Sequence, residues 1–191
     1  MTVHLISGRE GTGKTTLCEI LTKRGYPSID TDMYPGLGVW VDRSKGEAVP
    51  SKLVPHPVDE AWVRTHDYNW DEGVINELLS RYEGRQAFLC GSSSNHQDFF
   101  PLFGLRFSLW AQEGTIIRRL QQRDPYMWRF ESTELIRRLR DNQSARTEAI
   151  LNGSIVIYAE LPSEQVADDI IAYILAAKHP GGSLHYGANH R

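Results

Sequence analysis

Residues 8–15 read GREGTGKT and match the pattern G-x-x-x-x-G-K-[ST]. Immediately before them, residues 3–7 (VHLIS) form a short apolar run that predicts a buried strand. Immediately after them, residues 14–24 (KTTLCEILTKR) place apolar side chains on one face of a helix that Gly25 would end. The motif therefore stands between a strand and a helix, the context that this pattern requires. A glycine-rich turn that arose by chance is the alternative, and the flanking elements disfavour it.

The loop has the chemistry of a phosphate site. Glycines let the chain fold tightly, so that backbone N–H groups and the helix N-terminus face an anion. Lys14 can reach the β- and γ-phosphates of a nucleotide as a point charge, and the Thr15 hydroxyl can ligate Mg²⁺. The sequence therefore predicts a nucleotide-binding loop, with ATP and Mg²⁺ as cofactors. The candidate residues are Gly8, Arg9, Glu10, Gly11, Thr12, Gly13, Lys14, Thr15 and Thr16.

The overall charge is modest, because 21 basic and 24 acidic residues among 191 give a net charge of -3. No strong field favours binding to nucleic acid or to an anionic membrane, so any bound anion must be held locally. Met1 is followed directly by TVHLIS, without the features of a signal peptide or a transmembrane helix. We expect a cytoplasmic protein in which Cys18 and Cys90 are buried thiols.

Strands and helices alternate along the chain. Segments with helical periodicity separate the short apolar runs, which indicates βαβ units. We therefore predict an α/β fold in which a five-stranded parallel sheet lies between two helical layers. Ligands in such sheets bind beyond the carboxyl ends of the strands. The predicted strands are 3–7, 26–30, 86–91, 105–111 and 154–159.

One domain, residues 1–177, accounts for this pattern, and residues 178–191 are expected to be a mobile tail. Residues 33–70 differ in character, because prolines and glycines are frequent and aromatic residues are spread among polar ones. We interpret this segment as an insertion, with a helix at about 58–66.

Two acids follow the second predicted strand, in the sequence IDTD at 29–32. Many P-loop NTPases hold Mg²⁺ through an acid at the end of a further strand. The third and fourth strands end in FLCG and SLWAQE, and neither has an aspartate at its tip. Alternate residues of a strand point the same way, so Asp30 and Asp32 can approach one site. No D-x-x-G followed by N-K-x-D is present, which speaks against a GTPase switch.

The P-loop, these acids, GSSSN at 91–95, RRLQQR at 118–123 and ELIRRLRDNQ at 134–143 together resemble the small P-loop kinases. That superfamily includes the nucleoside monophosphate kinases, shikimate kinase and gluconate kinase. The resemblance implies that Asp30 supports Mg²⁺ through its water shell and that Asp32 orients the acceptor hydroxyl or accepts its proton. A helix cap or an Asx turn before Pro35 is the structural alternative for both acids.

The resemblance also gives roles to arginines around the transferring phosphoryl group. Arg119 and Arg123 lie four residues apart on one helical face, where arginines open the lid in the similar kinases. Arg138 or Arg137 on the following helix would return to the phosphates. Residues 124–131 are then a short lid rich in aromatic side chains. Arginines that are simply solvated on long helices are the alternative.

The acceptor itself is expected to meet Asp32 and the turn after the third strand. Gly91 would allow close approach, and Ser92 and Asn95 offer a hydroxyl and an amide, although such clusters also form plain turns. The histidines lack the spacing of metal ligands, so no zinc site is predicted. The candidate catalytic residues are Lys14, Asp32, Arg119, Arg123 and Arg138.

These residues predict a kinase that phosphorylates a hydroxyl of a small molecule, such as a nucleoside, a sugar or an antibiotic. Only Arg43, Arg64, Lys45 and Lys52 are basic in the insertion, which favours a hydroxyl acceptor over a nucleotide. A nucleoside monophosphate kinase is the alternative among enzymes. A nucleotide-gated binding protein or regulatory ATPase is the alternative from another class. The sequence leaves open the acceptor, the choice between ATP and GTP, and the oligomeric state.

Overall fold

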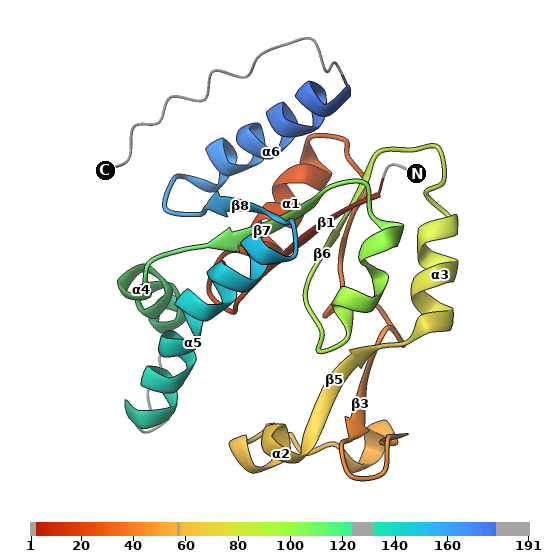
Figure 1. Ribbon diagram of the computed structural model, residues 1–191, viewed down its shortest axis with the longest axis vertical. Helices are drawn as coiled ribbons and strands as arrows, with labels where there is room; N and C mark the ends of the chain where they lie inside the picture. The colour runs from red at the N-terminus through yellow and green to blue at the C-terminus, as the bar shows by residue number, and fades with distance from the viewer. Residues whose placement is uncertain (1–2, 57, 124–131, 179–191) are drawn as a thin grey trace.

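The computed structural model describes residues 3–56, 58–123 and 132–178; for Glu60 and residues 132–141 it describes the backbone alone. At its centre is a five-stranded sheet in the order β2-β6-β1-β7-β8, in which every neighbouring pair is parallel (Figure 1). The predicted α/β fold with a five-stranded parallel sheet is therefore confirmed. The strands are β1 (Val3–Gly8), β2 (Ser28–Asp30), β6 (Ala87–Cys90), β7 (Arg106–Trp110) and β8 (Ile155–Tyr158).

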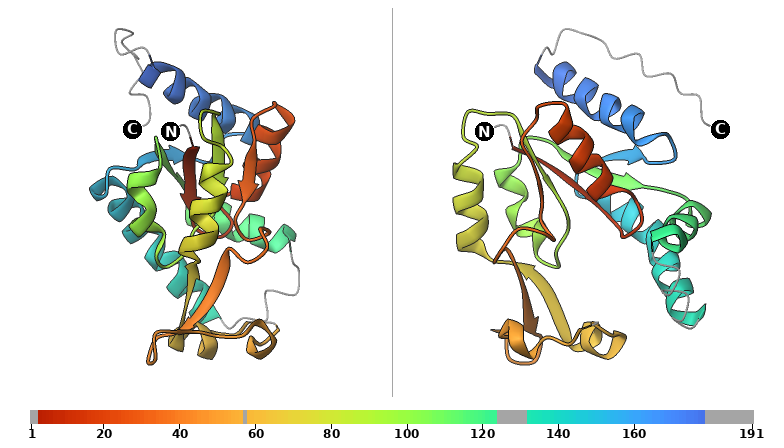
Figure 2. Two further views of the ribbon diagram at one scale, coloured as in Figure 1. Left: turned by 90° about the vertical axis from the view of Figure 1, so that its right-hand side faces the viewer. Right: turned by 180° about the vertical axis from the view of Figure 1, so that it is seen from behind.

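Helices cover both faces of this sheet, which explains why its central strands are continuous apolar runs. Apolar side chains of α1, α4 and α6 pack on one face around Ile6 and Phe107. On the other face, α3 and the 3₁₀ helix η2 pack around Leu5 and Leu89. The helix α5 lies against β7 and β8 on the same side as η2 (Figure 2, left). These helices are α1 (Lys14–Lys23), α3 (Glu72–Ser80), η2 (His96–Leu102), α4 (Glu113–Arg123), α5 (Ser132–Leu151) and α6 (Ser163–Lys178).

The insertion is a small antiparallel sheet, which the sequence analysis did not predict. Its strands lie in the order β4-β3-β5, and they project beyond the carboxyl edge of the main sheet (Figure 1). The expected helix is present but shorter, as α2. The elements are β3 (Gly38–Asp42), β4 (Glu47–Ala48), the 3₁₀ helix η1 (Ser51–Leu53), α2 (Glu60–Thr65) and β5 (His66–Trp70).

Two buried side chains anchor the small sheet in the main core. Leu37 and Trp70, at 0% and 2% exposure, pack with α3 and η2. Between them the backbone N–H of Asp71 donates to the Leu37 carbonyl at 2.8 Å. The Asp71 side chain then caps α3 by accepting from the N–H of Val74. The small sheet is thus held at its base, and its far end extends away from the core.

Two further observations concern the chain as a whole. Cys18 and Cys90 are both buried free thiols, as expected. Within residues 3–56, 58–123 and 132–178, no helix has the length and apolar character needed to cross a membrane.

Candidate active site

The loop between β1 and α1 has the shape that its glycines predicted. Gly8 has φ +145°, and a Cβ there would lie 2.8 Å from the Leu109 carbonyl oxygen. Gly13 has φ +99° and precedes the first residue of α1. The buried Thr12 closes the loop, because its hydroxyl donates to the Arg9 carbonyl at 2.7 Å. Only glycine adopts these φ values without strain, so the loop depends on its glycines at both ends.

Lys14 is folded back over this loop. Its ammonium group donates to the carbonyl oxygens of Gly8 at 2.6 Å and Arg9 at 3.1 Å. Burial lowers the pKa of Lys14, and the nearby carboxylates of Asp32, Glu10 and Asp30 partly offset that effect. The arrangement holds a positive charge where a loop of this kind receives phosphate oxygens.

The two acids after β2 occupy different positions. One oxygen of Asp30 accepts the backbone N–H of Asp32 at 3.0 Å, so the Asx turn that was the structural alternative is formed. Asp32 lines a cavity together with Lys14. Loss of water at the cavity wall raises the pKa of Asp32, the charge of Lys14 opposes this rise, and Asp30 adds to it. Asp30 therefore shapes the turn from which Asp32 faces the cavity.

The turn after β6 supports the site more than it lines it. The space beside Gly91 is filled by Thr31, whose hydroxyl would lie 1.6 Å from a Cβ at that position. The amide of Asn95 accepts from the N–H of Trp70 at 2.8 Å and donates to the Trp70 carbonyl at 3.0 Å. Ser92 lines the cavity and donates to the Gly8 carbonyl at 3.3 Å. Of the three predicted acceptor contacts in this turn, the structure brings only Ser92 to the cavity.

The predicted arginines occupy different positions and make different contacts. Arg119 donates to the carbonyl oxygens of Thr12 at 3.2 Å and Ala159 at 2.7 Å, so it joins the P-loop to the turn after β8. Arg123, at the end of α4, is close enough for its charge to lower the pKa of Asp32. Arg137 and Arg138 lie on α5 among the residues with only the backbone described. The predicted lid, 124–131, lies outside the described residues.

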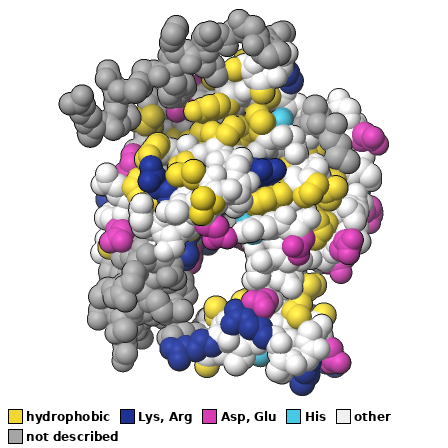
Figure 3. Space-filling model, viewed as in Figure 1, with side chains coloured by type: hydrophobic (Ala, Val, Ile, Leu, Met, Phe, Trp, Pro, Cys, Tyr) yellow, Lys and Arg dark blue, Asp and Glu magenta, His cyan; other side chains and the backbone are white. Residues whose placement is uncertain are grey.

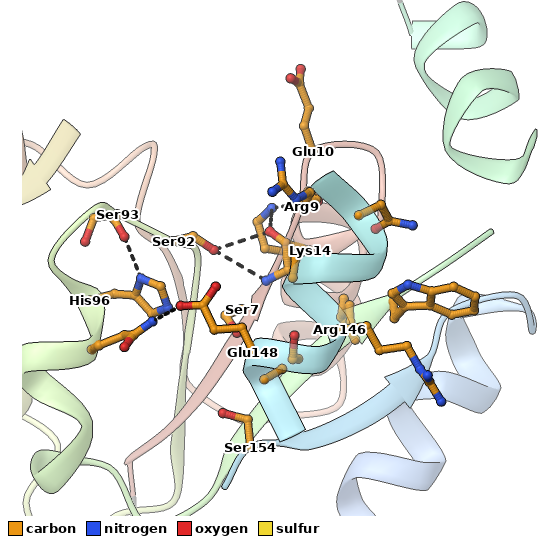
Figure 4. A pocket seen from close by; sticks show the side chains of 18 of the residues that line it. Ser7, Arg9, Glu10, Lys14, Ser92, Ser93, His96, Arg146, Glu148 and Ser154 are labelled. Carbon is orange, nitrogen blue, oxygen red and sulfur yellow. Dashed lines mark hydrogen bonds between the residues drawn. The ribbon is translucent and has the colours of Figure 1, made fainter. Parts of the chain in front are cut away.

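A cavity of about 660 Å³ is lined by Lys14, Asp32 and Ser92. It begins at the P-loop, where Figure 4 shows Lys14, Arg9 and Ser92 side by side. Tyr68 from β5 and Val63 from α2 bring the small sheet to its wall. The surface is deeply hollowed between the small sheet and the core, with both acidic and basic side chains around the hollow (Figure 3).

Several cavity residues on η2 and α5 were not predicted from the sequence, among them Gln97 and Glu148. Both side chains are polar and belong to helices, so nothing in the local pattern distinguished them from solvated surface residues. Tyr68 carried a weak signal, because it was one of several aromatic residues in an otherwise polar insertion.

The residues present fit an Mg²⁺ ion carried by a nucleotide. Such an ion keeps several waters and takes one or two protein oxygens in addition to phosphate oxygens. Thr15 is exposed in the first turn of α1, and no described residue hydrogen-bonds to its hydroxyl. Asp30 has a second carboxylate oxygen beside Lys14 and Asp32. The described residues contain no cluster of three histidine, cysteine or acidic side chains that would hold a metal without a nucleotide.

Comparison with solved structures identifies the fold. A shikimate kinase from Acinetobacter baumannii in complex with shikimate aligns over 94% of this chain and 96% of its own, with a TM-score of 0.56 and 18% identity. The chain has the fold of the small P-loop kinases. A gluconokinase from Sinorhizobium meliloti 1021 matches this kinase fold over 95% and 98% of the two chains, with a TM-score of 0.51 and 15% identity. A deoxyadenosine kinase from M. mycoides with bound dCTP matches it over 92% and 100%, with a TM-score of 0.51 and 16% identity.

In sequence, the chain matches no protein-family model and none of the curated proteins. The kinase fold is therefore established through structure, and the predicted resemblance to small P-loop kinases is confirmed at the level of the fold.

Proposed function

We propose that this protein is an ATP- and Mg²⁺-dependent kinase that transfers the γ-phosphoryl group to a hydroxyl of a small molecule. One observation carries the proposal: Asp32 and Lys14 face the same cavity at the carboxyl edge of the sheet. A phosphate-binding lysine and a carboxylate that line one cavity are groups that phosphoryl transfer between a nucleotide and an alcohol requires. The fold of shikimate, gluconate and deoxyadenosine kinases supports the same reaction class.

In this proposal the loop amides and Lys14 bind the triphosphate. Asp32 orients the acceptor hydroxyl and takes its proton while the acceptor oxygen bonds to the γ-phosphorus and the bond to the ADP oxygen breaks. The charge of Arg123 lowers the pKa of Asp32, and in this role Arg123 balances charge at the acceptor side. Arg119 keeps the P-loop in place against the turn after β8.

Thr15 and Asp30 are the residues that would hold Mg²⁺. When bound, the ion neutralises charge on the β- and γ-phosphate oxygens. Because Asp30 already gives one oxygen to the N–H of Asp32, its contact with the ion would be through water or its second oxygen.

An ADP-release screen tests the proposal. Nucleosides, nucleoside monophosphates, sugars, sugar acids and aminoglycosides are each added to the protein with MgATP or MgGTP. We expect ADP release that depends on an acceptor with a free hydroxyl, and a phosphorylated product by mass spectrometry. Acceptor-independent hydrolysis alone would instead indicate a regulatory ATPase, and activity confined to nucleotides would indicate a nucleoside monophosphate kinase.

The Asp32→Asn variant tests the role of the carboxylate. Turnover should fall by a factor on the order of 10²–10⁴, because the acceptor proton loses its base. Titration with a non-hydrolysable ATP analogue should give an unchanged Kd, since Asp32 is assigned to the acceptor. A variant that retains full turnover would refute the assignment of Asp32.

A further inference from the structure

Part of the cavity leaves the P-loop and follows the face of the main sheet. Ser7 on β1 and Ser108 on β7 line this part, and Ser154, which precedes β8, lies at its far end. Because the strands are parallel, Ser154 is at the amino edge of the sheet while Lys14 is at the carboxyl edge. In Figure 4, Ser154 and Glu10 lie at opposite ends of the cavity, with Ser7 and Glu148 between them. We call this part the sheet-face chamber.

The sheet-face chamber exists because its walls carry small and polar side chains. On β7 the residues alternate, so Phe107 and Leu109 fill the core beneath α1 and α6 while Ser108 faces the opposite way. On α5 the residues facing the chamber include Ala145 and Ala149. Large apolar side chains at these positions would close such a space, as they do on the other face of the sheet.

Polar side chains of η2 and α5 line the chamber on its solvent-exposed side, where Gln97 and Glu148 are both exposed. One carboxylate oxygen of Glu148 accepts from the side-chain amide of Gln97 at 2.5 Å. No described residue hydrogen-bonds to the second oxygen of Glu148, to the Gln97 amide oxygen or to the Ser108 hydroxyl. A carboxylate, an amide and a hydroxyl offer the mixed acceptors and donors that adjacent hydroxyl groups of a sugar or polyol can satisfy. Phe100 supplies an apolar surface beside them.

Glu148 is the acidic side chain of the chamber, and the arginines beside the chamber, Arg106 and Arg146, bind other groups. Arg106 donates to the Asn152 carbonyl at 3.0 Å and lies 4.7 Å from the centroid of the Phe100 ring. Arg146 lines the cavity, but its guanidinium is turned away from Glu148 (Figure 4). It donates to the Tyr158 hydroxyl at 2.6 Å and lies 5.6 Å from the centroid of the Trp110 ring. Among the described residues, Glu148 forms no ion pair, so an anionic group bound against its carboxylate would meet repulsion there.

From this geometry we infer that the sheet-face chamber binds the far end of a neutral or cationic, hydroxyl-rich molecule, such as a polyol, a neutral sugar or an amino sugar. The identification of that molecule as the phosphoryl acceptor rests on the proposed function. Its near end then presents a hydroxyl to Asp32, and its far end contacts Glu148, Gln97 and Ser108. The acceptor lies partly along the sheet face and not only beyond the strand ends.

Direct binding tests the chamber without reference to catalysis. Saturation-transfer NMR on the nucleotide-free protein compares neutral sugars and polyols, amino sugars, sugar acids and sugar phosphates of matched carbon number. We expect members of the first two classes to bind. Glu148→Gln should weaken the best ligand about tenfold or more, the loss typical of a hydrogen bond to a charged group. Ser108→Val should also weaken its binding, because it removes the hydroxyl and puts an additional methyl group on the chamber wall.

Two control variants distinguish a loss of ligand binding from a general loss of folding. Glu83→Gln removes a carboxylate from an exposed turn, and Ser144→Val changes an exposed position of α5. Both should bind the ligand as the wild type does. The inference is overturned if no compound of the panel binds, if sugar acids or phosphates bind best, or if Glu148→Gln binds the best ligand unchanged. Glu148→Gln keeps the side-chain shape, so the test stands even if Ser108→Val does not fold.

Kinetics then separate the chamber from the proposed reaction. If a chamber ligand binds but releases no ADP with MgATP, the kinase assignment fails and the chamber stands. If an acceptor is phosphorylated with the same KM in the wild type and in Glu148→Gln, the kinase assignment stands and the chamber fails. If the kinase assignment and the chamber are both correct, Glu148→Gln raises the acceptor KM about tenfold while the KM for ATP stays the same.

Discussion

At the scale of single residues, Asp32 combines the role proposed for it with an energetic cost. Its pKa is raised by loss of water at the cavity wall, so the folded protein binds a proton there more tightly than the unfolded chain does. Folding stability therefore falls as the pH rises from the ordinary aspartate pKa through the raised value, and the cost is fully present at neutral pH. Charge is thus kept at a position where it opposes folding, which is common for catalytic groups.

We predict that Asp32→Asn raises the melting temperature at pH 7 although it lowers turnover. The gain should disappear below the ordinary aspartate pKa, where Asp32 is protonated in both states. Differential scanning fluorimetry across pH measures both effects, with Glu83→Gln as the control for an exposed carboxylate. An equal or lower melting temperature for Asp32→Asn at pH 7 would contradict this account.

The residues of the site were predictable from sequence to different degrees. Lys14 and Asp32 belong to short motifs with local geometry, and the structure brings both to one cavity. Asn95 could not be interpreted in the same way, because the backbone groups that occupy its amide belong to Trp70, which is 25 residues away in the chain. Glu148 and Gln97 meet across 51 residues, and only the packing of α5 against the sheet brings them together.

At the scale of elements, the small sheet explains how the insertion reaches the site. β3 and β5 are paired residue by residue from Gly38 opposite Trp70 to Asp42 opposite His66. Single-sequence patterns did not reveal these strands, because each is only five residues long, polar residues make up most of β5, and all residues except the buried Trp70 are half-buried. The backbone N–H of Ser94 donates to the Tyr68 carbonyl at 2.7 Å, which ties β5 to the turn after β6. Tyr68 is thereby held at the cavity.

Gly38 is the position in this element most sensitive to substitution. A Cβ there would lie 1.8 Å from the Tyr68 hydroxyl oxygen and 2.2 Å from its ring. We predict that Gly38→Ala lowers the free energy of unfolding by about 1–3 kcal/mol and raises the acceptor KM, because the Tyr68 ring must leave its place. Urea unfolding and ADP-release kinetics measure the two effects.

A second substitution shows whether the clash is the cause. The double variant Gly38→Ala/Tyr68→Ala should have the same free energy of unfolding as Tyr68→Ala alone, because alanine at position 38 then meets no ring. The acceptor KM should stay high. Gly114→Ala is the matched control, since a Cβ there meets nothing within 4 Å. If Gly38→Ala destabilises the protein equally with and without Tyr68, the contact between Gly38 and Tyr68 is not responsible.

At the scale of the whole molecule, the apolar runs of the sequence were sufficient to predict the five strands and their parallel arrangement. A continuous apolar strand must be covered on both faces, and the helices between the strands provide that cover. The sheet-face chamber was not predictable by the same reasoning. It depends on which helix covers Ser7 and Ser108, and sequence patterns do not specify that contact. Global architecture thus follows from hydrophobicity, while the shape of the cavity follows from the small residues within it.

One buried group in the central strand couples the whole fold to pH. His4 on β1 is 5% exposed, and its ring packs against Phe88 at 5.6 Å. Its Nδ1 accepts the backbone N–H of Leu105 at 3.0 Å, so the ring is neutral in the folded protein. Burial, with a smaller effect from the charge of Lys178, lowers the pKa of His4 from 6.5 to about 4.

Between these two pKa values the unfolded chain binds a proton that the folded protein does not. The contribution of His4 to folding stability is therefore fully present above pH 6.5. It is lost as the pH drops toward 4, by about 3 kcal/mol for a shift of this size. We predict that His4→Gln, whose amide oxygen can accept from Leu105, removes this part of the acid destabilisation. Urea unfolding at pH 7, 5.5 and 4.5 gives the free energy of unfolding at each pH. The effect of His4 is the difference between the variant and the wild type in the slope of this free energy against pH. His56→Gln, at an exposed position, should keep the wild-type slope.

Because β1 pairs with both β6 and β7, protonation of His4 should destabilise the sheet as one unit, and fluorescence and circular dichroism should report the same transition. Equal slopes for the wild type and His4→Gln would show that other groups control the acid sensitivity of the fold.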